Sequence, residues 1–391
     1  MIGVIFITIA IITAWADYRA YRKLSPSKKW HKFAIAANFI LLNILPLISI
    51  SATAISADSG QGIMNFASWT LTLYTIATLV RLGFYIGYLT INHKSASITV
   101  GTTIAVSILA ILCNSLINTR TNLVVRNISI QHDNLPQSFN GFRIALFSDL
   151  HIGSLLSPEQ EIANLAQAIN AQEPDVVIFA GDLLHIRHNE ISPKIAAILS
   201  TIKAPHGVYT VLGNHDTGTY IKDSIAMPRN ENIAHLNTKI GQIGWSMLRD
   251  STIYAVRGCD SIAVTGVDFT DALLEYKHSF STPDNFSARE IFDGIPKEMF
   301  NIAISHLPQL WRSISDGDFA ELTLSGHVHA TQIAVELFGK RFSPAMMMHR
   351  EWSGHYTDKD NHLYITDGIG SVGFYLRIGA NPELTIIELN R

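Results

Sequence analysis

The chain has 391 residues, of which 48% are hydrophobic and 16% charged, and its net charge is −3 at pH 7. This length exceeds what one ordinary domain needs, so we expect two structural units. Residues 1–119, the N-terminal part, carry eight Lys/Arg against two acids, which leaves −9 for residues 120–391, the C-terminal part. An acidic C-terminal part argues against nucleic acid as a partner, because affinity for a phosphate backbone comes mostly from Lys and Arg. The two cysteines, one in each part, exclude a disulfide framework.

The N-terminal part consists of four apolar stretches. Residues 33–57 and 95–119 each run 25 residues without a charge, and about 20 apolar residues cross a bilayer as a helix. Residues 66–91 form a third stretch and residues 1–16 a shorter first one. A cleavable signal has its basic residues before the apolar run, whereas the basic cluster Arg19–Lys32 follows it here. We therefore predict an N-terminal transmembrane bundle of about four helices.

The loops between these stretches predict the orientation, because cytoplasmic loops carry an excess of Lys and Arg. Residues 17–32 include six basic residues and one acid, the loop around Asp58 has no basic residue, and the loop around Lys94 has one. The first and third loops are thus expected inside, and the C-terminal part outside. Arg81 is the one charge within a span. It either contacts a lipid phosphate or a partner within the bundle, or snorkels to the inner interface.

Five short apolar runs in the C-terminal part have the pattern of buried strands. They are residues 142–147, 176–180, 208–212, 302–305 and 322–324. Helical intervals such as residues 159–172 suggest crossover connections between them. Ligands in open α/β sheets gather beyond the carboxyl ends of strands, so we expect these five ends to converge on one crevice.

Each of these runs is followed by residues of metal-ligand type, namely Asp149, His151, Asp182, Asn214, His306, His327 and His329. Asp149 and His151 are two apart, so both side chains can face one metal while Leu150 points away, and His327 and His329 repeat that spacing. Glycines that suit a tight turn or a close backbone approach precede three ligand positions, at Gly181, Gly213 and Gly326. A set of imidazoles, carboxylates and one amide favours Mn, Fe or Zn, whereas Ca and Mg prefer more oxygen ligands.

The calcineurin-like metallophosphoesterase superfamily has a signature that this chain resembles in five places, Asp149-x-His151, Gly181-Asp182, Gly213-Asn214-His215-Asp216, His306 and Gly326-His327-x-His329. The resemblance covers about residues 127–391. It implies an α/β fold, a four-layer sandwich of two mixed β-sheets flanked by helices. Leu135-Pro136 and residues 368–389 further resemble a bacterial, membrane-associated branch. Some relatives in that branch act on glycolipid pyrophosphates or phosphodiesters.

The resemblance also implies two divalent metal ions, with Mn favoured. The first would be bound by Asp149, His151 and His329, and the second by Asn214, His306 and His327, with Asp182 bridging the two. His215 would donate a proton to the leaving group, and Asp216 would orient His215.

The chain departs from this pattern in two places. Val328, Ala330 and Thr331 stand where relatives often have Thr, Gly and Gly, and the last two side chains would narrow the approach to the metals. His185 stands where an acid is common after Gly-Asp-Leu. Among the other histidines, His349 and His355 are the best candidates for substrate contact.

These observations predict a metal-dependent phosphoester hydrolase, a phosphodiesterase or pyrophosphatase, in a bacterial inner membrane with its catalytic domain extracytoplasmic. Membrane lipids would be both its tether and a possible substrate. The alternative is a metal-bound membrane scaffold or sensor without turnover. A short connection, residues 119–140 with a strand at 123–130, would keep the domain near the bilayer. Phe338, Phe342 and Met346–Met348 either face lipid or pack into the core.

Overall fold

The computed structural model describes residues 2–24, 33, 36–37, 40, 44, 60–220, 227–276 and 286–391. The chain divides into two compact units. One is Met1–Asn118 with Val372–Leu376, and the other is Thr119–Ser371 with Arg377–Arg391. The division falls where the charge of the sequence changes sign. The membership of residues 372–376 in the first unit follows from no pattern in the sequence.

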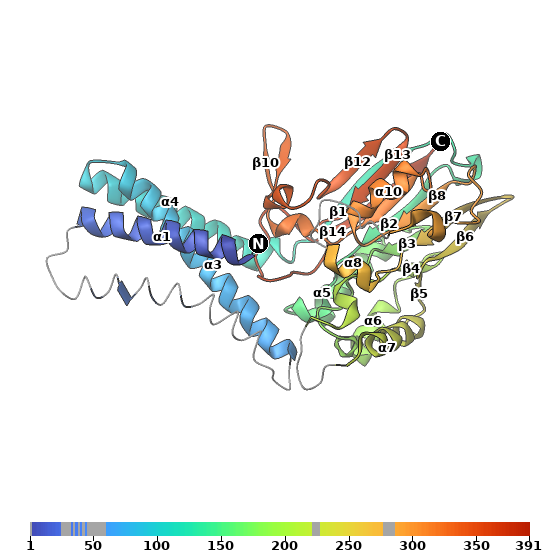
Figure 1. The fold of residues 1–391 in the computed structure, drawn as a ribbon, viewed down its shortest axis with the longest axis horizontal. Coiled ribbons are helices and arrows are strands. Elements are labelled where there is room, and N and C mark those ends of the chain that lie inside the picture. Colours follow the sequence, from blue (N-terminus) through green and yellow to red (C-terminus); the bar gives the residue numbers. More distant parts are fainter. Residues whose placement is uncertain are drawn as a thin grey trace. The chain divides into compact units, whose positions relative to one another are not determined.

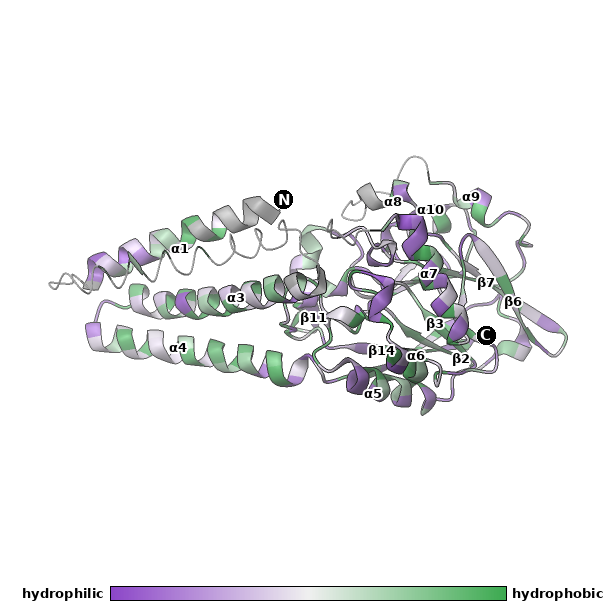
Figure 2. Cartoon of the chain, turned by 90° about the horizontal axis from the view of Figure 1, so that it is seen from below, coloured by the Kyte–Doolittle hydropathy of each residue, from purple (hydrophilic) through white to green (hydrophobic). Residues whose placement is uncertain are grey.

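The first unit is helical, with α1 (Ile2–Leu24), α3 (Gly60–Thr90) and α4 (Lys94–Asn114) in its described part (Figure 1). Two segments, Met64–Thr90 and Lys94–Thr119, are long and apolar enough to cross a membrane. In Figure 2, the hydropathy colouring marks most of α4 as hydrophobic. These segments correspond to the third and fourth predicted spans. The second predicted span, residues 33–57, lies almost wholly outside the described residues.

Arg81 of α3 forms an ion pair with Asp17 of α1. The guanidinium Nη1 lies 3.3 Å from Asp17 Oδ2, and the two side chains are 7% and 9% exposed. The hydroxyl of Tyr85 donates to the other oxygen of Asp17 at 2.5 Å. Of the alternatives that the sequence left open for Arg81, the structure therefore shows a contact within the helical unit. A charge among apolar helices is costly unless it is paired in this way.

The second unit contains two six-stranded mixed sheets. The first has the order β1-β14-β2-β3-β4-β5. Strand β14 pairs parallel to β1 and antiparallel to β2, and the pairs from β2 to β5 are parallel. Its strands are β1 (Val124–Gln131), β2 (Phe142–Phe147), β3 (Val176–Phe179), β4 (Val208–Thr210), β5 (Ser246–Met247) and β14 (Glu383–Asn390).

The second sheet has the order β12-β13-β9-β8-β7-β6. Its four inner strands are parallel, and the edge strands β12 and β6 are antiparallel to their neighbours. The strands are β6 (Ser251–Arg257), β7 (Asp260–Gly266), β8 (Asn301–Ile304), β9 (Leu322–Ser325), β12 (Gly354–Asp358) and β13 (Asn361–Ile365). A separate hairpin consists of β10 (Val335–Leu337) and β11 (Lys340–Phe342).

Alternate residues of the strands enter two different apolar layers, as expected for sheets that are buried on both faces. In β2, Ile144 and Leu146 join the core shared with the second sheet, whereas Ala145 and Phe147 pack with the helices. Those helices are α5 (Pro158–Asn170), α6 (Pro193–Leu199) and α7 (Arg229–Gln242). The helices α8 (Asp271–Tyr276), α9 (Ala288–Ile291) and α10 (Trp311–Asp316) contribute Leu273, Ala288 and Ile314 to the same apolar layer. The predicted sandwich of two mixed sheets flanked by helices is confirmed.

Candidate metal centre

The five predicted strands all form, as β2, β3 and β4 of the first sheet and β8 and β9 of the second. Because the strands within each set are parallel, their carboxyl ends lie at the same edge. The candidate ligands follow these ends and gather into two groups.

The first group consists of Asp149, His151 and His329, whose ligand atoms all lie within 4.8 Å of one another. His329 Nε2 is 3.1 Å from Asp149 Oδ1 and 3.2 Å from His151 Nε2. All three side chains are buried. Leu150, between two of them in sequence, packs into the core as predicted.

The second group consists of Asp182, His306 and His327. His306 Nε2 lies 3.3 Å from Asp182 Oδ2 and 3.3 Å from the amide oxygen Oδ1 of Asn214. The same Asp182 oxygen lies 3.6 Å from His151 Nε2 in the first group. Asp182 therefore faces both groups at once.

His327 and His329 belong to different groups, although their spacing suggested that both side chains face one metal. The intervening residue Val328 has helical dihedral angles, φ −83° and ψ −30°, and His327 has a φ of 72°. The alternation of side chains that the prediction assumed needs an extended chain, and this segment is not extended.

Five of the ligand positions have left-handed backbone, with φ between 42° and 72° at Asp149, His151, Asp182, His327 and His329. Side chains other than glycine rarely adopt this conformation, and such strain is concentrated at functional sites. Neighbouring glycines make room for the turned ligands. A Cβ on Gly213 would lie 2.1 Å from Asp182 Oδ1, and one on Gly326 would lie 2.4 Å from Asp149 Oδ2. The close approach predicted for these two glycines is confirmed.

His215 lies beside the first group, with its ring centroid 4.6 Å from that of His151. Its Nδ1 is 2.7 Å from the carbonyl oxygen of His185, which directs Nε2 away from that carbonyl. The Asp216 carboxylate accepts hydrogen bonds from the backbone N–H groups of Asp182, Leu184 and Gly213. Asp216 thus holds the turns that carry the ligands. The His215 ring itself contacts the carbonyl oxygen of His185, and the orientation of His215 by Asp216 that the family resemblance implied stays a prediction.

The sequence analysis did not predict two of the side chains that lie at the site. Tyr220 stacks on His215 with ring centroids 3.7 Å apart, and its hydroxyl accepts a hydrogen bond from Asn214 Nδ2 at 2.5 Å. Arg377 is fully buried, and its Nη2 lies 3.3 Å from His329 Nδ1. Neither residue belongs to a strand-end motif, so sequence reasoning had no signal for them.

Histidines near the centre differ in their environment. The ring of His185 lies 5.5 Å from that of His215, and burial lowers the pKa of His185 to about 3. The ring of His349 lies 5.9 Å from that of His327, so this candidate for substrate contact is close to the second group. His355 instead stacks on His362, with His355 Nε2 2.9 Å from His362 Nδ1.

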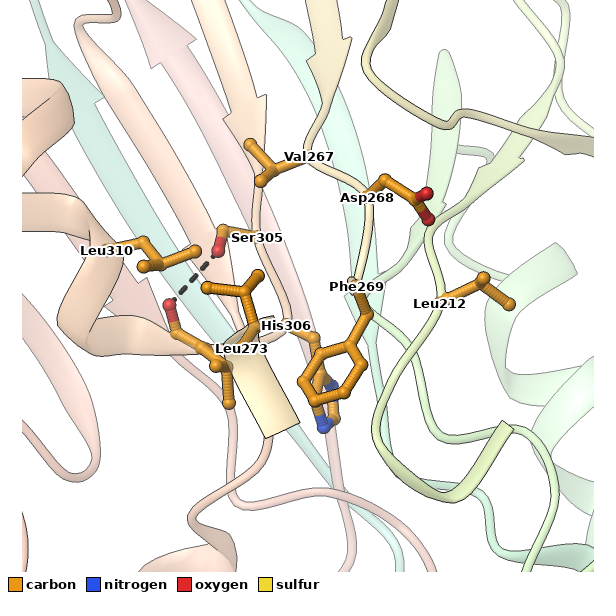
Figure 3. A pocket seen from close by; sticks show the side chains of 9 residues that line it. Leu212, Val267, Asp268, Phe269, Leu273, Ser305, His306 and Leu310 are labelled. Atoms are coloured by element: carbon orange, nitrogen blue, oxygen red, sulfur yellow. Dashed lines mark hydrogen bonds between the residues drawn. The ribbon is translucent and has the colours of Figure 1, made fainter. Parts of the chain in front are cut away.

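His306 lines a small pocket whose other side chains are mostly apolar, as Figure 3 shows. Phe269 meets the imidazole edge-on, with ring centroids 6.3 Å apart, and the pocket has no room for a water molecule. His306 Nδ1 contacts the carbonyl oxygen of Ala180 at 2.8 Å. Nε2 is consequently the nitrogen that His306 presents to Asp182.

The charges of the site suit divalent cations. In the described part of the chain, the ion-pair partners of the buried carboxylates Asp149 and Asp182 are imidazoles. Burial alone would lower the pKa of His306, but the charge of Asp182 raises it to about 9. Buried carboxylates need compensating positive charge, and metal binding supplies it by replacing such protons. The donor atoms, imidazole nitrogens with carboxylate and amide oxygens, fit Mn, Fe or Zn.

Comparison with known families gives a match that includes all seven candidate ligands. Residues 142–331 match the family model described as calcineurin-like phosphoesterase. The metallophosphoesterase YkuE of Bacillus subtilis is 26% identical over 67% of this chain and 83% of its own length. The transmembrane protein with metallophosphoesterase domain of Danio rerio is 26% identical over 74% of this chain, which spans 63% of that protein. The NAD nucleotidase structure of Haemophilus influenzae has a TM-score of 0.38 and 13% identity over 59% of this chain and 51% of that one.

Proposed function

We propose that the chain belongs to the calcineurin-like metallophosphoesterase superfamily, whose family model matches residues 142–331. Within it, the chain would be a membrane-tethered phosphodiesterase or pyrophosphatase with a dinuclear metal centre. The observation that carries the dinuclear proposal is the position of Asp182. One of its oxygens lies 3.3 Å from His306 Nε2 and 3.6 Å from His151 Nε2, between the two ligand groups. A carboxylate in that position can bridge two ions.

Asp149, His151 and His329 would hold the first ion, and Asn214, His306 and His327 the second, with Asp182 shared between them. Two divalent ions, most suitably Mn, would supply Lewis-acid activation of the attacking water and of the phosphoryl group. Two contacts support this arrangement. The Asp216 carboxylate accepts hydrogen bonds from the backbone N–H groups of Asp182 and Gly213, and mostly apolar side chains pack against His306.

His215 is the residue that we propose to protonate the leaving group. Its Nδ1 lies 2.7 Å from the His185 carbonyl oxygen, so Nε2 would be the nitrogen that donates to the departing oxygen. General acid catalysis of this kind typically contributes about 10²- to 10⁴-fold. Stacking with Tyr220 keeps the imidazole plane fixed while the proton moves.

For the substrate we propose a lipid-linked phosphodiester or pyrophosphate. Among the residues that the structure describes, two helices are long and apolar enough to cross a membrane, and the relative from Danio rerio is described as a transmembrane protein. An enzyme that is tethered in this way meets membrane lipids at high local concentration.

The distribution of Lys and Arg supports an extracytoplasmic catalytic unit in a bacterial inner membrane, because residues 17–32 carry six basic residues. Alkaline phosphatase fused after Arg391 tests this topology. Activity of the fusion in intact cells is expected. Fluorescence from a cytoplasm-only reporter at the same position would refute the orientation.

The test of activity uses the purified full chain with bis(4-nitrophenyl) phosphate, with and without added Mn. Mn-dependent release of nitrophenol is expected. Binding of Mn without turnover would instead favour a metal-bound scaffold or sensor. Release of headgroup or phosphate from a panel of membrane lipids would then identify the substrate class.

A further inference from the structure

The hairpin β10–β11 and the turn after it form an exposed apolar surface, here called the apolar hairpin. Its tip residue Phe338 is fully exposed, and Met347 is 80% exposed. The large apolar side chains that are exposed on this surface are Val335, Leu337, Phe338, Phe342, Met346 and Met347. Packing into the core, one of the two places that the sequence allowed for this stretch, is therefore excluded for Phe338, Phe342, Met346 and Met347, whereas Met348 is partly buried. Exposed apolar side chains that are gathered in this way usually mark an interaction site.

The strand register assigns the two faces of the hairpin different roles. Val335 pairs with Phe342 and Leu337 with Lys340, and these residues share one face because side chains alternate along a strand. The pair of Glu336 and Arg341 lies on the other face. The apolar side chains are thus on one face of the ribbon, with a lysine at its end.

The face of the hairpin that includes Arg341 packs against the rest of the second unit. The guanidinium of Arg341 pairs with the buried carboxylate of Asp367 and contacts the hydroxyl of Ser353. It also lies 5.7 Å from the ring centroid of Trp352. With its base anchored in this way, the hairpin presents the opposite, apolar face outward.

The hairpin is also joined to the loop that carries the candidate ligands His327 and His329. The hydroxyl of Ser343, directly after β11, donates to the carbonyl oxygen of Ala330 at 2.6 Å. Thr331 and Ser343 have hydroxyl oxygens 3.2 Å apart. Ser343 and Ala330 therefore connect the apolar hairpin to the loop of the metal centre, so a surface that binds the hairpin also contacts an element joined to that loop.

We propose that the apolar hairpin inserts into the interface of the bilayer in which the chain's own apolar helices lie. A bilayer surface matches both properties of the hairpin, since acyl chains accept the apolar side chains and anionic headgroups attract the exposed Lys340 and Arg350. Lys340 shares the apolar face, where its stem can extend along that surface to bring the ammonium to headgroup level. The tethering helices keep this surface available to the hairpin continuously.

This step rests on the proposed function. Insertion of the hairpin would bring the loop with His327 and His329 near lipid phosphates. The link through Ser343 and Ala330 makes the hairpin a docking element for lipid substrates. It contributes nothing to the hydrolysis of a small soluble ester. The two substrate types should therefore respond differently to changes in the hairpin.

The direct test measures insertion without using catalysis. The full chain with Cys113→Ser and Cys259→Ser receives one cysteine at Phe338→Cys, labelled with a polarity-sensitive fluorophore, in nanodiscs that contain phosphatidylglycerol. The matched control is Val256→Cys on β6, where the native side chain is 59% exposed. We expect a blue shift and strong quenching by brominated lipid for the label at 338 and neither effect for the label at 256. A label at 338 that stays in water overturns the proposal.

The second test uses two substrates with the same leaving group, a phospholipid with a 4-nitrophenyl phosphodiester headgroup and soluble bis(4-nitrophenyl) phosphate. The variant Leu337→Ser/Phe338→Ser should lose most turnover of the lipid and keep that of the soluble ester. Tyr254→Ser/Val256→Ser on β6 removes comparably exposed apolar side chains and should change neither. Equal loss on both substrates overturns the docking role. Absence of any hydrolysis by the parent chain would contradict the proposed function alone, because the quenching test still decides insertion.

Discussion

The phenol ring of Tyr220 lies nearly parallel to the imidazole of His215, with centroids 3.7 Å apart and planes at 16°. The hydroxyl of the same tyrosine accepts a hydrogen bond from Asn214 Nδ2 at 2.5 Å. Tyr220 thus contacts both a proposed ligand of the second metal and the proposed leaving-group acid.

We predict that Tyr220→Phe and Tyr220→Leu separate these two contacts. Tyr220→Phe keeps the stacking but loses the partner of the Asn214 amide, so Mn binding at the second site should weaken by about 10- to 100-fold. Tyr220→Leu also loses the stacking, so rates should in addition depend more steeply on leaving-group pKa. Calorimetric Mn titration and a series of aryl phosphodiesters measure the two effects. Unchanged Mn affinity in Tyr220→Phe would show that the hydroxyl does not position Asn214.

Asp182→Asn should abolish turnover without unfolding the domain. A bridging carboxylate sets the charge at both metals, whereas the strand before it, β3, is held by its buried Val176–Phe179 side chains. Activity, metal content and circular dichroism are compared with those of Asp133→Asn, a change at a residue outside the site. Near-normal turnover of Asp182→Asn would contradict the dinuclear centre.

His215→Ala should retain both metals and lose rate chiefly on substrates with poor leaving groups. Alkyl phosphodiesters should react about 10²- to 10⁴-fold more slowly, because the departing alkoxide then receives no proton. Aryl esters leave without this help and should be affected least. His235→Ala, at an exposed position on α7, is the control. A uniform loss across substrates, or a missing metal, would assign His215 a different role.

Stability should fall on acidification through the pair His355 and His362. Burial lowers the pKa of both residues, and the neighbouring His355 and His132 lower that of His362 further. The unfolded chain then binds more protons than the folded chain below about pH 6.5, the ordinary histidine pKa, so stability is lost as the pH falls from there. Thermal unfolding between pH 7.5 and 5.5 should show a smaller decrease in Tm for His355→Gln/His362→Gln. The same decrease in wild type and variant would rule the pair out as its source.

Local sequence patterns were sufficient to predict those features of the structure that depend on residues close together in the sequence. The apolar run at residues 142–147 forms strand β2, and Asp149, Asp182 and His306 lie together because parallel strands end at one edge. Patterns were insufficient where long-range packing decides. Nothing near Tyr220 or Arg377 predicts contact with His215 or His329, since those contacts depend on how distant segments return to the site. The hydrogen bonds that the Asp216 carboxylate accepts from backbone N–H groups likewise depend on how segments distant in sequence come together.

The position of β14 inside the first sheet has a consequence for biogenesis. Residues 383–390 separate β1 from β2, so Val124 has its partner 259 positions later, at Glu383. During synthesis β1 and β2 leave the ribosome long before the strand that joins them, and pairings of such long range form slowly. Until that strand arrives, both carry unpaired edges of the kind that aggregate. The sheet that bears Asp149 and Asp182 can therefore close only after residue 390 has emerged, and the nascent domain needs protection until then.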